Sequence, residues 1–180
     1  EAIVGFSTES IIEALGGTPE PWIKPITNGT IRGVAGLVSC PSLGVSGQDV
    51  HSVQIAKELI KRNILVLSMG CGNAAMQVAG LCSLEAKEMA GNGLKAVCEL
   101  LKIPPVLSYG TCTDTGRIAD LLAALSYSLG GISVSDLPVA AVAPEYMEQK
   151  ATIDAVFALA FGLYTYVNPV PKVTGGSNLV

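Results

Sequence analysis

The sequence has few charged residues, few aromatic residues and a single histidine. Of its 180 residues, 14% are charged and 5% are aromatic, and His51 is the one histidine. A free-standing domain usually carries about a quarter of its residues as charges. We therefore expect another domain or subunit to cover much of its surface. With one histidine at the start of an expected helix, a Ser-His-Asp triad is not supported.

Several motifs and segments are also missing. The formal net charge is −4 and no basic run occurs, so no nucleic-acid partner is expected. Neither G-x-G-x-x-G nor a P-loop is present, so a nucleotide is not indicated. Without Cys-x-x-Cys, a structural zinc knuckle or a self-contained ferredoxin-type cluster is not expected. No signal peptide is expected. The longest uncharged apolar stretch, Ala155–Val167, is too short to span a bilayer. A cytoplasmic location is expected, with peripheral attachment to a membrane left open.

Short apolar runs alternate with helical patterns along the chain. This alternation predicts an α/β fold, a Rossmann-like open parallel sheet with helices on both faces. Residues 1–180 are expected to form one domain, and the start at Glu1 suggests a piece of a longer protein. The expected strands are Ala2–Phe6, Arg32–Ser39, Asn63–Met69, one that begins at Pro105, and Leu137–Val142. The expected helices are 9–15, 21–28, 73–81, 83–101 and 147–164, with one more from Asp49 or Ser52 to 62 and another, 114–129, capped by Asp114 or Thr113.

Three apolar runs end in a cysteine. They read VAGLVSC up to Cys40, ILVLSMGC up to Cys71 and PVLSYGTC up to Cys112. Ligands of open α/β sheets sit beyond the carboxyl ends of the strands, so these three cysteines are expected along one edge of the sheet. Thiolates are soft ligands, and the pattern therefore favours a soft-metal or iron–sulfur site there over three packing residues.

The other two cysteines and the histidine are expected elsewhere. Cys98 falls on an apolar helical stripe and Cys82 at a junction, so both are interpreted as core residues. His51 lies in the first turn of its expected helix, where a capping or solvated role fits better than a metal ligand. Three thiolates are too few for a closed four-ligand site, so further ligands must come from elsewhere.

Four motifs together resemble a known family. LVSCPS around Cys40, SMGCGNAA around Cys71, PPVLSYGTCTDTGRIADLL around Cys112 and APEYMEQKA around Lys150 follow one another at separations of 31, 41 and 38 residues. In this order they resemble the carboxyl-terminal part of the catalytic subunit of the nickel-containing anaerobic carbon monoxide dehydrogenase. The resemblance covers essentially the whole chain.

The resemblance implies a role for each motif. The cofactor would be a nickel-iron-sulfur cluster of the Ni-4Fe-4S type. Cys112 would bind nickel, and Cys40 and Cys71 would bind framework irons. Lys150 would be the catalytic lysine, which hydrogen-bonds carbon dioxide and helps to move protons. The family's remaining ligands, a histidine and two cysteines, lie upstream, and His51 is not expected to replace them.

The resemblance also implies partners. Carbon monoxide, carbon dioxide and water would be the small molecules, and a ferredoxin-like carrier would take the electrons. The upstream part of the same subunit would carry further 4Fe-4S clusters, and the full subunit would be a homodimer. A fragment that lacks half of the ligands is expected to be inactive alone.

Two alternatives remain open at this point. A domain like that of the hybrid cluster protein, which reduces hydroxylamine or nitric oxide, would have a similar scaffold with iron and no nickel. The TCTDTGR run at Thr111–Arg117 favours the dehydrogenase. A non-catalytic binding or scaffold module, with purely structural cysteines, is the alternative of a different class.

Overall fold

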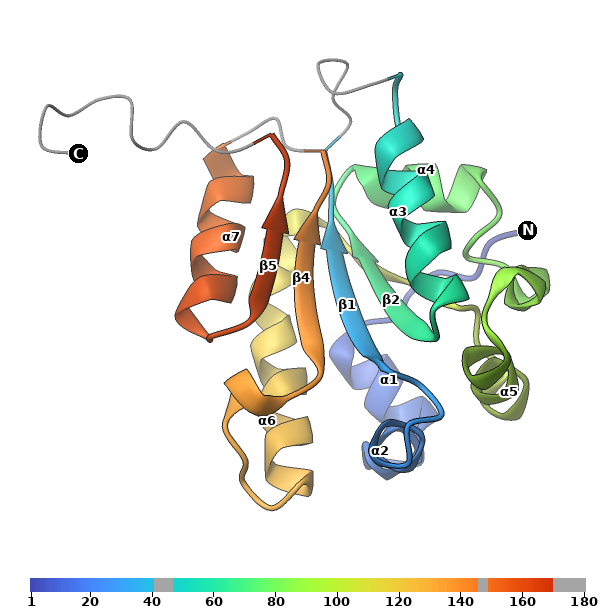
Figure 1. Ribbon diagram of the computed structural model, residues 1–180, viewed down its shortest axis with the longest axis vertical. Helices are drawn as coiled ribbons and strands as arrows, with labels where there is room; N and C mark the ends of the chain where they lie inside the picture. The colour runs from blue at the N-terminus through green and yellow to red at the C-terminus, as the bar shows by residue number, and fades with distance from the viewer. Residues whose placement is uncertain (41–46, 146–148, 170–180) are drawn as a thin grey trace, which may run out of the picture.

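A five-stranded parallel sheet forms the centre of the molecule (Figure 1). The computed structural model describes residues 1–40, 47–145 and 149–169. The strand order is β3-β2-β1-β4-β5 and each neighbouring pair is parallel, which confirms the predicted fold class. The strands are β1 (Gly33–Val38), β2 (Ile64–Met69), β3 (Val106–Gly110), β4 (Val139–Ala143) and β5 (Tyr164–Val167).

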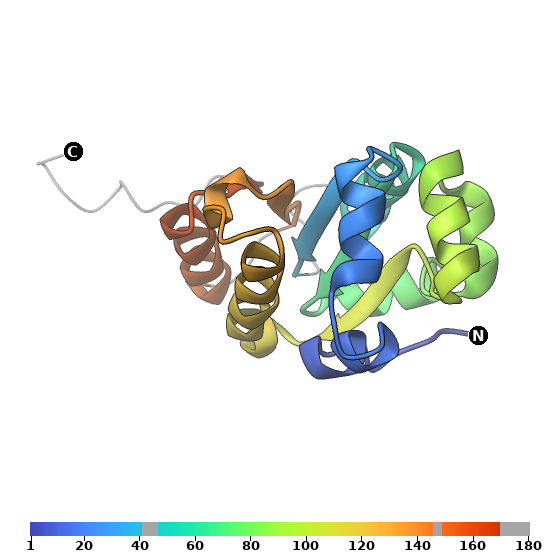
Figure 2. The ribbon, with the colours of Figure 1, turned by 90° about the horizontal axis from the view of Figure 1, so that it is seen from below.

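Helices connect the strands and cover both faces of the sheet. Helices α2, α6 and α7 cover one face of the sheet and line a cavity between themselves and the strands. Helix α1 packs against α6 on the same face. Figures 1 and 2 show α3 on the opposite face, where it packs against α4. The α-helices are α1 (Thr8–Ala14), α2 (Glu20–Thr27), α3 (Val50–Lys61), α4 (Gly72–Val78), α5 (Asn92–Leu101), α6 (Ile118–Ser128) and α7 (Gln149–Ala160). Three short 3-10 helices are η1 (Leu84–Met89), η2 (Cys112–Arg117) and η3 (Val134–Asp136).

The central strands are buried on both faces, as their uninterrupted apolar sequences predict. Leu65, Val66 and Leu67 of β2 are at most 3% exposed, although successive side chains of a strand point to opposite faces. Covering both faces of a parallel sheet requires such continuous apolar runs. Cys82 and Cys98 belong to the same core, as expected. Within the described residues, no helix is both long and apolar enough to cross a membrane.

The sheet differs from the prediction at both of its edges. Ala2–Phe6 is not a strand of the sheet: it makes a single bridge, between Val4 and Ser108. The fifth strand is instead β5, which begins at the last residue of the expected helix 147–164. That helix ends at Ala160, and Gly162 follows with φ +74°. The four residues of β5 are half-exposed or exposed, unlike those of the inner strands.

Two expected helices are also divided. The expected helix 83–101 consists of η1 and α5, with Gly91 and Gly93 at the break. A β-carbon on Gly93 would overlap the carbonyl oxygen of Thr30, and one on Gly91 would lie 2.7 Å from the carbonyl oxygen of Lys61. Tertiary packing at these glycines therefore overrides the local helical pattern. The expected helix 114–129 begins as η2 and continues as α6.

Two glycines allow the turn after β2 to pack against the end of β1. Gly70 has φ +78°, and a β-carbon there would lie 2.7 Å from the carbonyl oxygen of Ser39. A β-carbon on Gly72 would overlap the Ser39 side chain, with Ser39 Oγ at 2.8 Å. Without side chains, these glycines permit a close approach of the backbone. In the structure, the close approach is to the neighbouring strand.

We expect Gly72→Ala to destabilise the fold because the added methyl group would push the Cys71 turn away from Ser39. The expected cost is about 1–3 kcal/mol, the range for overpacking a close contact. Chemical unfolding of the variant chain, compared with wild type, measures this cost.

Gly116→Ala is the matched control for Gly72→Ala. Gly116 also lies beside one of the three strand-end cysteines, but its β-carbon would meet nothing within 4 Å. Equal stabilities of the two variants would contradict the proposed role of the Ser39 contact.

Candidate functional site

Three cysteines follow the carboxyl ends of three adjacent strands. Cys40, Cys71 and Cys112 each come two residues after the last residue of β1, β2 and β3. Because these strands are parallel neighbours in the order β3-β2-β1, the cysteines share one edge of the sheet. We refer to the ends of β1, β2 and β3 with these three residues as the cysteine edge. The predicted placement along one edge is therefore observed.

Backbone hydrogen bonds join the three turns of the cysteine edge. Gly72 N–H donates to the Ser39 carbonyl oxygen at 2.8 Å, and Ser39 N–H donates to Met69 at 3.2 Å. On the other side, Gly70 N–H donates to the Gly110 carbonyl oxygen at 3.1 Å. The turn that carries Cys71 is thus bonded to both of its neighbours, which fixes the three cysteine backbones relative to one another.

The five cysteines fall into two groups that differ in their exposure to solvent. Cys71 is exposed, Cys40 and Cys112 are half-buried, and all three thiols are free. Burial raises the pKa of Cys82 to about 11 and is the main cause that raises the pKa of Cys98 to about 12. Buried thiols of this kind are poor ligands because the thiolate is the binding form. Only the cysteines of the edge are therefore accessible for metal chemistry.

In the described residues, the three cysteines of the edge do not meet around the position of one metal ion. Across residues 1–40, 47–145 and 149–169, no three His, Cys, Asp or Glu side chains form a group that could hold one metal ion. Iron–sulfur clusters, in contrast, contain several metal ions and are held by several cysteine thiolates. Three accessible thiols on adjacent strand ends fit the second kind of centre by their donor chemistry.

A buried glutamate connects the end of β4 to Cys40 and α3. Cys40 N–H donates to the Glu145 carbonyl oxygen at 2.8 Å. The Glu145 carboxylate accepts the His51 backbone N–H at 3.1 Å, and its side chain is fully buried. The His51 ring lies 3.4 Å from the Tyr166 hydroxyl. His51 is therefore in the first turn of α3, as expected, and Glu145 caps its backbone.

Cys112 opens a 3-10 turn with its own capping box. Thr111 N–H donates to Asp114 Oδ2 at 3.0 Å, and Thr111 Oγ1 donates to the same oxygen at 2.8 Å. Thr115 Oγ1 donates to the Cys112 carbonyl oxygen at 2.7 Å. The cap is thus Thr111, with Asp114 at the third position of the turn, whereas the sequence suggested Asp114 or Thr113 as the cap. These bonds fix the backbone on both sides of Cys112.

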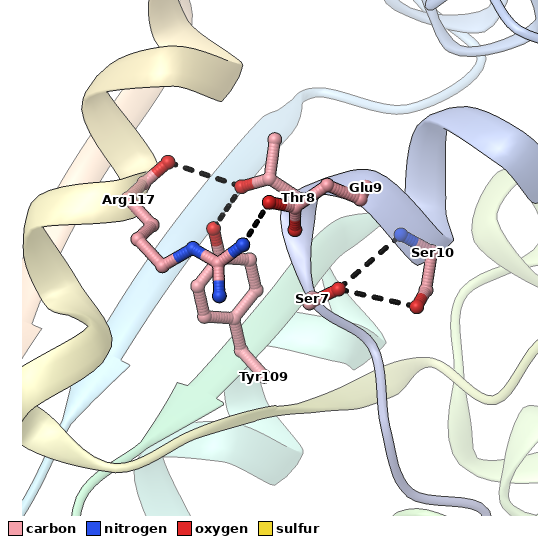
Figure 3. A network of polar contacts seen from close by, with 6 residues as sticks. All are labelled: Ser7, Thr8, Glu9, Ser10, Tyr109 and Arg117. Carbon is pink, nitrogen blue, oxygen red and sulfur yellow. Dashed lines mark hydrogen bonds and ion pairs between the residues drawn. The ribbon is translucent and has the colours of Figure 1, made fainter.

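Helix α1 holds the segment around Cys112 from outside (Figure 3). Thr8 Oγ1 donates to the Arg117 carbonyl oxygen at 3.0 Å, and it also bonds the Tyr109 hydroxyl. Because the single Thr8 hydroxyl proton is used on Arg117, Tyr109 must be the donor in the second bond. The Arg117 guanidinium pairs with Glu9. We call Thr8, Glu9, Tyr109 and Arg117 the α1 clamp.

The α1 clamp brackets Cys112 in the sequence. Tyr109 lies at the end of β3 and Arg117 ends η2, so one helix contacts the chain before and after the cysteine. Thr8 and Tyr109 are 8% and 5% exposed, which protects their bonds from competition with water. The Arg117–Glu9 pair is largely exposed and should contribute little.

Lys150 lies in the first turn of α7, just after the start at Gln149. This places its backbone in the connection that follows β4, on the carboxyl side of the sheet. Its side chain is outside the described residues, and its catalytic role stays a prediction.

Asp154 is a candidate functional residue that the sequence reasoning missed. It lines a pocket together with Cys112, and its Oδ2 is buried without a hydrogen-bond partner in the described part of the chain. Burial raises the pKa of Asp154 to about 6. A signal was present: Asp154 is the single charge in the otherwise uncharged stretch Ala151–Val167.

We expect Tyr109→Phe to cost about 1 kcal/mol of unfolding free energy, because it removes a buried hydrogen bond to Thr8. Chemical unfolding of the variant and of wild type gives this difference. Tyr127→Phe is the control, since the Tyr127 side chain is 85% exposed. A Tyr109→Phe protein as stable as the control would show that the clamp is energetically neutral.

We expect the unfolding free energy of Asp154→Asn, relative to that of wild type, to increase as the pH rises from about 4 to about 6. Between these values the folded state holds the Asp154 proton and the unfolded state releases it, so the stability of wild type falls with rising pH. The relative gain should be about 1–2 kcal/mol, since partial exposure reduces the full effect. Unfolding curves of both proteins across this pH range measure it. A constant difference would contradict the raised pKa.

The chain is similar to known proteins of one family. A model of the Prismane/CO dehydrogenase family matches residues 2–180. Carbon monoxide dehydrogenase 2 of Methanosarcina mazei is 75% identical over 180 residues, which are 100% of this chain and 28% of that protein. A nickel-free carbon monoxide dehydrogenase structure from Thermococcus sp. AM4 has a TM-score of 0.92 at 46% identity, covering 98% of this chain and 28% of that one.

A further solved structure shows the same fold at lower identity. It is an acetyl-CoA synthase/carbon monoxide dehydrogenase described with NiZn[Fe4S4] and NiNi[Fe4S4] clusters in its alpha subunits, with a TM-score of 0.90 at 31% identity. The match covers 99% of this chain and 28% of that one. The chain thus spans little more than a quarter of the proteins it matches. Family model, sequence identity and fold agree, and the chain belongs to the Prismane/CO dehydrogenase family.

Proposed function

We propose that this chain is the carboxyl-terminal domain of the catalytic subunit of a nickel-containing carbon monoxide dehydrogenase. The observation that carries the proposal is the cysteine edge, which presents three free thiols from three adjacent strand ends. Relatives with up to 75% identity bear the name carbon monoxide dehydrogenase. Because the chain spans 28% of these relatives, residues 1–180 would be one domain of a longer subunit.

The residues of the edge suit a nickel-iron-sulfur cluster. Cys112 would bind the nickel, and Cys40 and Cys71 would bind irons of the framework. Thiolates are the ligands that such soft metals prefer, and the three thiols are accessible and outside any disulfide. When bound, the cluster supplies the redox and Lewis-acid chemistry for oxidising carbon monoxide with water to carbon dioxide, two protons and two electrons. Its remaining ligands would come from the rest of the subunit, so this chain alone would be inactive.

The chain's own contribution is to fix its three ligands before the cluster binds. Gly70 and Gly72 let the Cys71 turn pack against Ser39, next to Cys40. The α1 clamp and the capping box at Thr111 hold the backbone on both sides of Cys112. Ligands held in this way lose little conformational freedom when a metal binds, which favours binding.

Lys150 would act on the substrate and not on the metal. An ammonium group stabilises negative charge on carboxylate-like oxygens most strongly where water is excluded. The position of Lys150 at the start of α7 puts it in the connection after β4, on the same side of the sheet as the cysteine edge. There it could donate hydrogen bonds to carbon dioxide and pass on a proton.

The remaining expected partners belong to the full subunit. A ferredoxin-like protein would accept the two electrons through further 4Fe-4S clusters outside this chain, and the subunit would form a homodimer. The low content of charged residues supports a large interface with the rest of the subunit. Exposed apolar side chains support it too, since four of them on α7 and β5 are each at least 59% exposed: Ile153, Val156, Leu159 and Tyr164.

The proposal predicts that Cys112 and Lys150 fail in different ways when replaced in the full-length subunit. Cys112→Ser should lose nickel, because serine is a harder ligand, and activity should fall with it. Lys150→Ala should keep nickel and iron at wild-type levels but lose most of its carbon monoxide oxidation. Metal analysis per subunit and an activity assay with an artificial electron acceptor give both readouts.

Cys82→Ala is the matched control and should keep both metals, because Cys82 is a buried core residue. Full nickel content in Cys112→Ser would exclude the ligand role. Normal turnover by Lys150→Ala would exclude the lysine's role. Iron without nickel in the active wild-type subunit would instead indicate the hybrid-cluster type of chemistry.

A further inference from the structure

Glu145 occupies the place after β4 that Cys40 occupies after β1. Each residue comes two positions beyond the end of its strand, and the two strands are parallel neighbours. Glu145 also belongs to the APEYMEQKA motif, in which the proposed function uses Lys150 alone. Its side chain is fully buried, and glutamate is rarely buried in this way unless it has a partner.

The pairing of β1 with β4 continues beyond both strands as far as Cys40 and Glu145. Inside the sheet, Leu37 lies opposite Val142. Three residues further along each chain segment, the Cys40 N–H donates to the Glu145 carbonyl oxygen at 2.8 Å. The position of the Cys40 backbone therefore depends on where the Glu145 carbonyl group lies.

Helix α3 in turn holds the Glu145 side chain. Glu145 Oε1 accepts the His51 backbone N–H at 3.1 Å, in the first turn of α3, where N–H groups have no partner within the helix. Asp49 is the N-cap residue of α3, but its side chain makes no capping hydrogen bond. Glu145 thus caps α3 from 94 positions away in the sequence.

A second contact with α3 closes a ring around Cys40. Ser52 Oγ lies 2.5 Å from Ser39 Oγ, and both serines are at most 1% exposed. Ser52 follows His51 in the chain, and Ser39 precedes Cys40. The contacts therefore lead from Cys40 through Glu145, His51, Ser52 and Ser39 back to Cys40, so that α3 supports the cysteine backbone from two directions.

We propose that Glu145 is a positioning residue for Cys40. Because its carboxylate is bound at the start of α3, its carbonyl oxygen is held where it accepts the Cys40 N–H, and the cysteine backbone is fixed before the thiol binds. The consequence for an iron of the cluster rests on the proposed function of Cys40. The ring of contacts itself does not.

The test measures hydrogen exchange of the Cys40 N–H in the full-length subunit, by mass spectrometry resolved to single residues. Glu145→Gln keeps an acceptor oxygen at the same reach and should exchange at the wild-type rate. Glu145→Asp keeps the carboxylate but is one methylene shorter, so it should lose the bond to His51. Its Cys40 N–H should then exchange roughly tenfold faster, since exchange requires local opening and a buried hydrogen bond to a charged group resists it by about this factor.

Asp49→Asn is the matched control, because it removes a carboxylate from the same helix start without removing a capping bond. Asparagine also tolerates the left-handed backbone at this position, where φ is +63°. Exchange of the Cys40 N–H should not change. A wild-type rate in Glu145→Asp, equally fast exchange in Glu145→Gln, or faster exchange in the control would each overturn the proposal.

The metal content and the electron paramagnetic resonance spectrum of the same proteins separate this proposal from the proposed function. Glu145→Asp should contain less iron per subunit or give a shifted spectrum, and Glu145→Gln should restore both. If exchange follows the prediction but the wild-type subunit binds no nickel-iron-sulfur cluster, the positioning of Cys40 stands and the proposed function fails. If the cluster of Glu145→Asp is unchanged while exchange is faster, the role of Glu145 toward the iron is wrong.

Discussion

The carboxyl edge of the sheet depends on one contact, the packing of the Gly70–Gly72 turn against Ser39. The Gly72 N–H to Ser39 carbonyl bond and the missing β-carbons on both glycines bring the ends of β1 and β2 together. The Gly70 bond to Gly110 then adds β3. Side chains two residues beyond each strand are thereby set by the sheet itself, so a rigid scaffold and not a mobile loop determines where the three thiols lie.

Much of this arrangement follows from the sequence because it depends on local patterns. The uncharged runs before Cys40, Cys71 and Cys112 predicted buried parallel strands, and parallel strands necessarily end at one edge. The separation of Cys82 and Cys98 from the other three also followed from their apolar surroundings. Family membership agrees with the four motifs that extend to Lys150.

The parts that escaped prediction are those that tertiary contacts decide. β5 is a short, half-exposed edge strand, and the break at Gly91 and Gly93 reflects contacts with Asn63 and Thr30. In the sequence, Asp154 is simply one charged residue within an expected helix. Its importance depends on the pocket that it shares with Cys112, and no pattern of neighbouring residues reveals that pocket.

The α1 clamp has a consequence for where this chain can be truncated or fused. Thr8 and Arg117 are 109 positions apart, yet the geometry around Cys112 relies on both. A truncation or fusion junction placed after Thr8 would remove no thiol, but it would free the Cys112 turn on its outer side. Boundaries drawn from the positions of the three cysteines alone would therefore omit the amino-terminal helix that supports the Cys112 turn.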